Sequence, residues 1–252
     1  MEQKIKVGAV SYLNTKPLIY GFEQGKMKDQ LELIIDYPAI IAGLLQNDKI
    51  DIGLVPVAVI PSLAEYHIIS DYCIACDGEV ASVCLFSDVP LQEIENILLD
   101  YQSRTSVALL KILLKEHWKI SPNLIAGNEN YEKDITGTTA GLVIGDRALT
   151  QRLYSKYIYD LGSAWKEMTG LPFVFAAWVS NKKLPGNFIA DFNAANAEGF
   201  NHLDKVILQN PFIEFDLKNY YTDFVKFKLD ADLYEAMDLF LNKLKRNVET
   251  IS

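Results

Sequence analysis

Small polar residues follow the first β-rich run of the chain, in the segment SYLNTKPL (residues 11–18). Ser11, Asn14 and Thr15 carry hydroxyl and amide groups, and Pro17 favours a helix that begins at this point. Such side chains, together with the free N–H groups of a helix start, can hold a carboxylate by hydrogen bonds. The alternative is a loop whose polar residues only cap the helix.

A second segment of the same kind is DYQSRTSVALL (residues 100–110). Ser103 is typical of a helix N-cap, and Arg104, Thr105 and Ser106 then fall in the first turn. Hydroxyl groups and a guanidinium around a helix start suit a carboxylate ligand. A well-capped core helix would explain the same residues. Binding is favoured because the chain has two such turns.

Three further residues are candidates for the same ligand. Ser82 lies in the extended run EVASVCLFS (residues 79–87) and matters only if its side chain faces a cleft. Gly145 and Asp146 join a strand to a helix in IGDRAL (residues 144–149). Glycine allows close approach of the backbone, and the aspartate is suited to cap the helix that follows.

Motifs for the common cofactors are missing from the sequence. The three histidines, His67, His117 and His202, are far apart, and no HExxH, EF-hand or zinc-ribbon pattern occurs. GxGxxG and GxSxG are absent, and GFEQGK (residues 21–26) lacks the glycine spacing and the Ser/Thr of a phosphate loop. We therefore expect neither a metal nor an organic cofactor.

Charge and hydropathy narrow the choice of partner. The chain has 33 acidic and 24 basic residues and a net charge of −9, which disfavours a nucleic-acid or anionic-membrane surface. No apolar run approaches the roughly 20 residues needed to span a bilayer. The N-terminus also lacks the apolar segment of a secretory signal. We expect a cytoplasmic protein with a small-molecule ligand, and oligomeric state has no signature here.

The elements that must position these residues alternate between strand and helix patterns. β-rich runs at 4–10, 31–37 and 51–56, each followed by a helical pattern, predict three parallel strands. Two extended runs fill 66–87, and a second alternating series extends over 95–170. After a buried strand at 172–180, helical patterns occur at 186–208, 216–223 and 231–246.

This order predicts an α/β fold of two lobes with a ligand cleft between them. Residues 1–87 and 176–252 would form the first lobe, and residues 88–175 would form a second lobe inserted into it. Extended crossings near 82–88 and 172–180 would join the lobes as a hinge. Strand ends and helix starts converge on such a cleft, so the polar segments are expected to face one another.

Several of these segments together resemble the chorismate dehydratases of the futalosine pathway of menaquinone biosynthesis. The resemblance covers residues 4–180 in the family's order and rests on VSYLNTKPL, DIGLVPV, EVASVCLFS, SRTSVALLKILL, LVIGDRAL and DLGSAWKEMTGLPFVFAAW. It implies a type II periplasmic-binding-protein fold used as an enzyme. It also implies that chorismate loses water, without a cofactor, to give 3-[(1-carboxyvinyl)oxy]benzoate.

The family's motif implies roles for particular residues. Asn14 is expected to orient the reacting part of the substrate, and Ser82 to act in hydrogen bonding or proton transfer. Thr105 and Ser106 would hold a carboxylate, with Ser11 contributing from the other lobe. No strong base stands at the matched positions, so the hypothesis is that the substrate's own enolpyruvyl carboxylate takes the proton.

Two alternatives stay open. One is a non-catalytic binding or sensor protein for a small carboxylate, which would have the same lobes and helix starts. The other is the related 1,4-dihydroxy-6-naphthoate synthase, whose SPxPNDT-like loop differs from SYLNTKPL in this chain.

Overall fold

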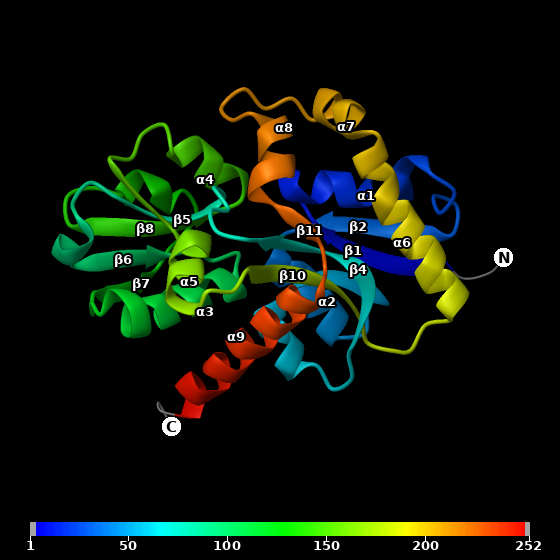
Figure 1. Ribbon diagram of the computed structural model, residues 1–252, viewed down its shortest axis with the longest axis horizontal. Helices are drawn as coiled ribbons and strands as arrows, with labels where there is room; N and C mark the ends of the chain where they lie inside the picture. The colour runs from blue at the N-terminus through cyan, green and yellow to red at the C-terminus, as the bar shows by residue number, and fades with distance from the viewer. Residues whose placement is uncertain (1–3, 250–252) are drawn as a thin grey trace.

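A computed structural model describes residues 4–249 of the chain, with side chains described as far as Arg246. It contains two β-sheets, and Figure 1 shows the two lobes that they form side by side. Residues 1–3 and 250–252, which belong to the range predicted for the first lobe, lie outside the described part.

The first sheet has six strands in the order β11-β4-β10-β3-β1-β2. Their bounds are Ile5–Val10 (β1), Leu31–Asp36 (β2), Ile52–Pro56 (β3), His67–Cys76 (β4), Phe173–Ser180 (β10) and Lys226–Lys228 (β11). The first three strands are parallel, as predicted, whereas β10 runs antiparallel between β3 and β4. Every residue of β3 and β10 is buried, because neighbouring strands and helices cover both of their faces.

The second sheet has five strands in the order β7-β6-β8-β5-β9. Their bounds are Val83–Ser87 (β5), Asn96–Leu99 (β6), Asn123–Ala126 (β7), Thr139–Ile144 (β8) and Tyr157–Asp160 (β9). The sequence analysis missed β7 and β11. β7 has only three apolar residues in a row, all exposed at the sheet edge, and β11 is only three residues long.

Helices cover both sheets. In the first lobe they are α1 (Lys16–Gln24), α2 (Pro38–Gln46), α6 (Gly186–Asn201), α7 (Leu203–Gln209) and α8 (Leu217–Asn219). In the second they are α3 (Arg104–Leu113), α4 (Asp146–Gln151) and α5 (Leu161–Thr169). The helical pattern predicted after residues 51–56 is a 3₁₀ segment, Val57–Ser62, because Pro61 lies inside it and lacks the N–H of a regular α-helix.

The strand assignment moves the predicted junctions between the lobes. β5 lies in the range predicted for the first lobe, yet it pairs with β8 and β9 of the second sheet. β10 lies wholly in the first sheet, although its first three residues fall in the range given to the second lobe. We therefore propose that the chain passes between the lobes at 77–82 and at 161–172, and not along 82–88 and 172–180.

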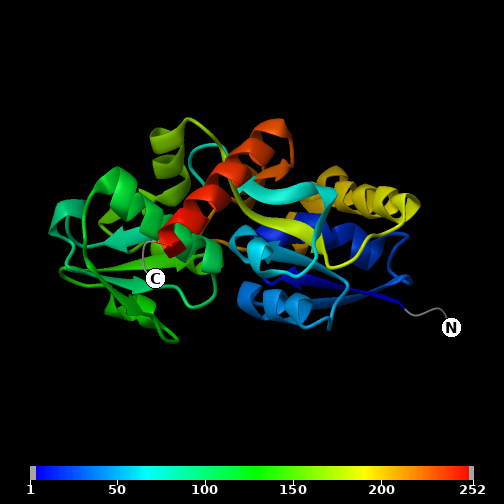
Figure 2. The ribbon, with the colours of Figure 1, turned by 90° about the horizontal axis from the view of Figure 1, so that it is seen from below.

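The last helix, α9 (Ala231–Glu249), lies across both lobes. It packs against β10 in the first lobe and against α3 in the second, and Figure 2 shows it crossing the junction between them. Its Phe240 is fully buried, with ring centroids 5.0 Å from Phe173 and 6.1 Å from Trp165. The helix therefore limits how far the lobes can separate without loss of apolar contact.

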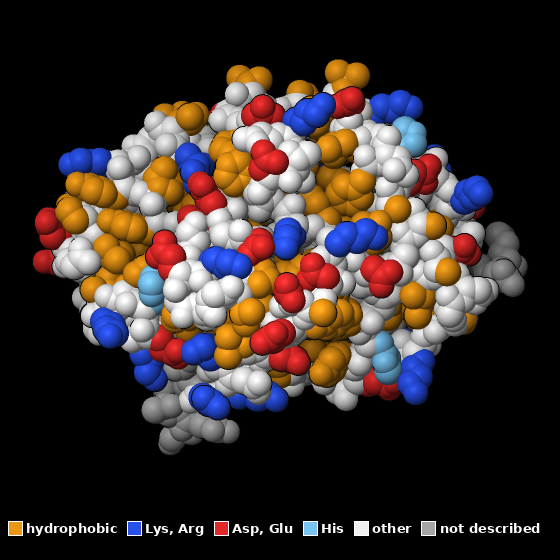
Figure 3. Space-filling model, viewed as in Figure 1, with side chains coloured by type: hydrophobic (Ala, Val, Ile, Leu, Met, Phe, Trp, Pro, Cys, Tyr) orange, Lys and Arg blue, Asp and Glu red, His pale blue; other side chains and the backbone are white. Residues whose placement is uncertain are grey.

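None of the helices in residues 4–249 combines the length and the apolarity needed to cross a membrane. The three cysteines, Cys73, Cys76 and Cys84, are buried and unpaired. On the face of the molecule in Figure 3, acidic and basic side chains are interspersed, and the basic ones form no continuous area there.

Helices α1 and α6 lie so close together that glycine is required at their contact. A Cβ atom on Gly199 would lie 1.9 Å from the carbonyl oxygen of Pro17, and one on Gly21 would lie 2.2 Å from that of Ala195. Both obstacles are backbone atoms, which cannot move without displacing a helix. The pairing of α1 with α6 holds the SYLNTKPL segment against the sheet.

We expect Gly199→Ala to lower the free energy of unfolding by about 1–3 kcal/mol, because the added methyl group must push the helices apart. Gly43→Ala in α2 is the matched control, since a Cβ there meets no atom within 4 Å. That control should gain about 0.5–1 kcal/mol from the better helix propensity of alanine. Urea unfolding measures both, and equal stabilisation would contradict the close approach.

Candidate active site between the two lobes

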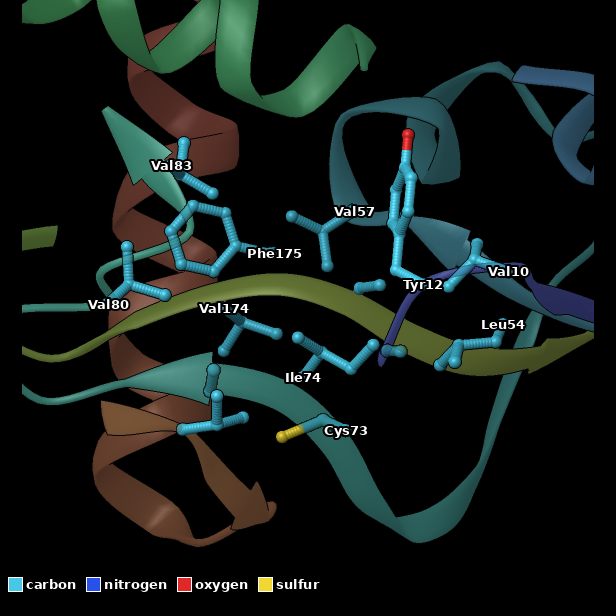
Figure 4. Close-up of a cluster of buried hydrophobic side chains, with 14 of the residues drawn as sticks. Val10, Tyr12, Leu54, Val57, Cys73, Ile74, Val80, Val83, Val174 and Phe175 are labelled. Carbon is cyan, nitrogen blue, oxygen red and sulfur yellow. The ribbon is translucent and has the colours of Figure 1, made fainter. Parts of the chain in front are cut away.

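A cavity lies where the two lobes meet. It encloses about 490 Å³ of space between atoms, part of it open to solvent. Its lining comes from both lobes and consists of Val10, Tyr12, Asn14, Pro38, Pro56, Ile74, Val80, Ser82, Val83, Ser103, Ser106, Ile144, Gly145, Phe175 and Ala176. Figure 4 shows part of the apolar wall, with Val80, Val83 and Phe175 on one side and Val10 and Tyr12 on the other.

No charged side chain is among the described residues that line this cavity. Its polar groups are the hydroxyls of Ser82, Ser103 and Ser106, the amide of Asn14 and the phenol of Tyr12. An anionic ligand would therefore be held by hydrogen bonds from hydroxyl, amide and backbone N–H groups, and not by a lysine or arginine. Within residues 4–249, no group of three or more His, Cys, Asp or Glu side chains is arranged to hold a metal ion.

The start of α3 supplies the hydroxyls from the second lobe. Ser103 is the N-cap, as predicted, and its Oγ accepts a hydrogen bond from the Ser106 N–H at 3.1 Å. It also donates to the Ser106 Oγ at 2.9 Å. Arg104 is exposed and does not line the cavity, and Thr105 Oγ1 instead accepts from the Ala58 N–H of the first lobe at 3.1 Å.

The segment SYLNTKPL supplies Asn14 from the first lobe. Asn14 lies in a short 3₁₀ turn, Leu13–Thr15, and is 8% exposed. No side chain caps either this turn or α1, so the alternative in which Asn14 serves only as a helix cap loses its support. Ser11 and Thr15 do not line the cavity, and Thr15 is fully buried beneath the loop.

Ser82 reaches the cavity from the segment that crosses between the lobes. Its N–H donates to the Val80 carbonyl at 2.7 Å, closing a three-residue turn around Ala81, whose φ is +62°. Left-handed backbone of this kind is strained for alanine. The Asp160 carboxylate holds the turn by accepting from the Ala81 N–H at 2.8 Å and from the Val80 N–H at 3.1 Å.

Gly145 and Asp146 hold the second lobe against the SYLNTKPL segment. Gly145 has φ +63°, and a Cβ on it would lie 2.8 Å from the ring of Tyr12. The sequence predicts Asp146 as the cap of α4, but this is wrong, because Gly145 occupies the N-cap position. Its Oδ1 instead accepts from the Leu13 N–H at 2.9 Å across the lobe boundary.

The sequence analysis missed several residues of this region. The Tyr220 hydroxyl, from the C-terminal part of the chain, donates to Ser82 Oγ at 2.7 Å. Tyr12 donates through its hydroxyl to Gln102 of the second lobe. Tyr12 stands inside the motif used for the resemblance and could have been named from it, whereas nothing in the local sequence around Tyr220 distinguishes it from a core tyrosine.

The family of the chain follows from comparison with known proteins. The family described as menaquinone biosynthesis matches residues 5–246. The protein belongs to the menaquinone biosynthesis family. The chorismate dehydratase of Thermus thermophilus is 26% identical to this member of the family over 226 residues, and the match covers 79% of each chain.

Solved structures show the fold of this family member. Protein AF1704 of Archaeoglobus fulgidus matches with a TM-score of 0.78 at 16% identity, covering 98% of both chains. The alkanesulfonate-binding protein of Xanthomonas axonopodis, bound to MOPS, matches with a TM-score of 0.64 at 13% identity, covering 95% of this chain and 93% of that one. The predicted two-lobed, periplasmic-binding-protein-like α/β fold is thereby confirmed.

Asp146 makes the stability of this menaquinone-family protein depend on pH. Burial raises the pKa of its carboxyl to about 6, against the opposing effect of the Leu13 N–H. An acid with a raised pKa binds its proton more tightly in the folded state, so its contribution to stability is greatest at about pH 4 and is lost as the pH rises to about 6. Asp146→Asn should therefore have a free energy of unfolding roughly 1–2 kcal/mol higher than that of wild type at pH 7.5, and an equal one near pH 4.5. Urea unfolding at the two pH values measures the difference.

The exposed Asp134→Asn, in the second lobe, controls for the loss of one negative charge. A less stable Asp146→Asn at pH 7.5 would mean that the hydrogen bond from Leu13 to the ionised carboxylate outweighs the cost of its burial.

Asp160 should matter for the stability of the turn before Ser82. Besides the two turn N–H groups, it accepts from the Ser163 N–H at 3.0 Å as the N-cap of α5. Asp160→Ala leaves these donors without their partner, and we expect a loss of about 2–4 kcal/mol in the free energy of unfolding. Asp134→Ala should change stability by less than about 0.5 kcal/mol, and an equally small effect of Asp160→Ala would show that water replaces the carboxylate.

Proposed function

We propose that this protein catalyses the cofactor-independent dehydration of chorismate to 3-[(1-carboxyvinyl)oxy]benzoate. The observation that carries the proposal is the meeting of Asn14 and Ser82, from segments 68 positions apart, on one uncharged cavity in a member of the menaquinone biosynthesis family. The similarity to a chorismate dehydratase supports it. The proposal includes a cytoplasmic location, where a biosynthetic enzyme meets its substrate.

The reaction removes the ring hydroxyl and the proton of the adjacent, ether-bearing carbon. The electrons of the broken C–H bond form a ring double bond and the C–O bond breaks. The proton removed from carbon is passed on to the departing hydroxide, which becomes water, so that no proton is gained or lost overall. The product ring is aromatic, so the reaction is strongly downhill. The protein must therefore hold the substrate in a reactive geometry and stabilise charge, and it need not supply an oxidant or an electron sink.

The cavity offers groups for each part of this task. The N–H groups at the start of α3, with the Ser103 and Ser106 hydroxyls, suit one substrate carboxylate. Asn14 and Ser82 then lie on the wall where the ring hydroxyl and the acidic C–H can be placed. Hydrogen bonds to charge that develops in a cavity shielded from water can each lower the barrier by about 3–4 kcal/mol.

The proton acceptor in the proposal is the enolpyruvyl carboxylate of the substrate itself. The described lining contains no carboxylate and no imidazole that could serve as the base. Asp146 is the carboxylate beside the cavity, but it is bonded to the Leu13 N–H and is not part of the lining. An analogue without the enolpyruvyl carboxylate should accordingly bind without turning over.

The principal alternative is a binding protein without catalysis. The similar sulfonate-binding structures support it, because a two-lobed cavity with the capped start of α3 in its wall also suits a solute. The related 1,4-dihydroxy-6-naphthoate synthase activity is a further alternative within the same pathway. Chemical conversion of chorismate separates the proposal from both.

The direct test is to incubate the purified protein with chorismate, without added metal or nucleotide, and to separate the products by mass-resolved chromatography. We expect a product one water lighter than chorismate, formed faster than in the protein-free control. Unchanged chorismate with folded protein would contradict the dehydratase proposal. Ligand screening by thermal shift would then test the binding alternative.

Asn14→Ala should lower kcat by about 100-fold or more, because a group that orients the reacting atoms is lost. Its melting temperature should stay close to that of wild type, since the side chain forms no cap and makes one weak hydrogen bond, at 3.4 Å, to Thr15. Asn187→Ala, on an exposed turn of α6, is the matched control and should leave kcat unchanged. Equal kcat for the two variants would remove Asn14 from the mechanism.

A further inference from the structure

Tyr220 is hydrogen-bonded to Ser82, one of the two polar side chains to which the proposed function assigns catalysis. It begins the short π-helical turn Tyr220–Phe224 that follows α8, 138 positions after Ser82 along the chain. Its hydroxyl donates to Ser82 Oγ at 2.7 Å, and the Asn14 side chain is near enough to the same hydroxyl to affect its pKa. The tyrosine is 1% exposed and is not part of the cavity lining, so it reaches any ligand only through Ser82.

We infer that Tyr220 is a positioning residue, which holds the Ser82 hydroxyl and directs the Ser82 proton into the cavity. The inference rests on the proposed dehydratase function. A serine hydroxyl has one proton to donate and two lone pairs to accept with. Because the Tyr220 proton occupies one lone pair of Ser82 Oγ, the serine's own proton is left for an acceptor in the cavity, such as the departing hydroxyl of the substrate.

The Tyr220 phenol stays protonated in its buried position. Burial raises its pKa far above the range in which the protein would work, so it keeps the proton that it donates to Ser82 Oγ. The hydrogen bond from Tyr220 to Ser82 is shielded from water, and it strengthens the hydrogen bond that Ser82 can donate in turn. The last donor, Ser82, is therefore a better stabiliser of charge on a leaving oxygen than a lone serine would be.

The ring of Tyr220 is held by packing and not by its hydroxyl. Its centroid lies 5.6 Å from that of Tyr221 and 6.0 Å from that of Phe215, and the Tyr220 N–H donates to the Asp216 carbonyl at 2.9 Å. A phenylalanine would therefore occupy the same place. This allows the function of the hydroxyl to be separated from the structural role of the ring.

The experiment compares kcat and KM for chorismate in wild type, Tyr220→Phe, Ser82→Ala and the double variant. We expect Tyr220→Phe to lower kcat by about 10–100-fold, with KM changed by less than about threefold, because the loss falls on the transition state and not on binding. Ser82→Ala should lower kcat by at least as much. In the Ser82→Ala background, Tyr220→Phe should have almost no further effect, since its partner is already gone.

The control is Tyr72→Phe, which removes the hydroxyl of a buried tyrosine on β4, outside the cavity lining. It should leave kcat and KM as in wild type. Should Tyr220→Phe not fold, p-aminophenylalanine at position 220 keeps both the ring and a donor, and it should retain most of the wild-type kcat.

Each outcome has a separate meaning. A folded wild type that does not convert chorismate would refute the proposed function itself. An active wild type with an unchanged kcat in Tyr220→Phe would overturn the positioning role. So would an equal fractional loss from Tyr220→Phe in the presence and in the absence of Ser82, because the effect would then not pass through that serine. A folded but inactive p-aminophenylalanine variant would overturn it as well.

Discussion

The structure depends on hydrogen bonds whose two partners come from different parts of the chain and are buried only when the lobes meet. Each bond gives a partner to a polar group that would otherwise be buried without one. Leaving a buried polar group unsatisfied costs about 1–3 kcal/mol. They are Leu13 N–H to Asp146, Ala58 N–H to Thr105, Tyr12 hydroxyl to Gln102 and Tyr220 hydroxyl to Ser82. The same contacts close the cavity and align its polar groups, so stability and site geometry are linked.

An uncharged cavity is a suitable place for a substrate that carries its own charges. Hydroxyl, amide and helix N–H groups can hold a carboxylate without neutralising it, which a lysine or arginine beside it would do. The carboxylate then stays basic enough to accept a proton from a neighbouring carbon. In the proposed reaction the fixed dipoles of Asn14 and Ser82 would stabilise charge as it develops, and the turn held by Asp160 already orients Ser82.

The same fold serves proteins that only bind ligands, so chemistry must reside in a few side chains and in how firmly they are held. Two packing features hold the framework around the cavity of this chain. Glycines at the α1–α6 contact let two backbones approach, and α9 packs against both lobes. Tyr220 and Asp160, which lie behind the lining, fix Ser82 from its side chain and from its backbone.

The sequence by itself determined the alternation of strands and helices, because apolar periodicity and turn residues are local signals. It also determined the two helix starts at SYLNT and SRTS, and through its motifs the family. The catalytic roles of Asn14 and Ser82 stay a prediction. The sequence could not determine which sheet β5 and β10 join, since pairing depends on contacts distant along the chain.

Only the tertiary structure decided which polar residues face the cavity. Ser103 and Ser106 line it. Thr105 and Asp146 also lie at helix starts, but they accept hydrogen bonds from backbone N–H groups of the first lobe. Tyr220 has no local signature, because its role arises from the approach of a C-terminal turn to Ser82 across 138 positions of sequence. Residue types and spacing fix what a side chain can do, but the packing of the lobes fixes what it meets.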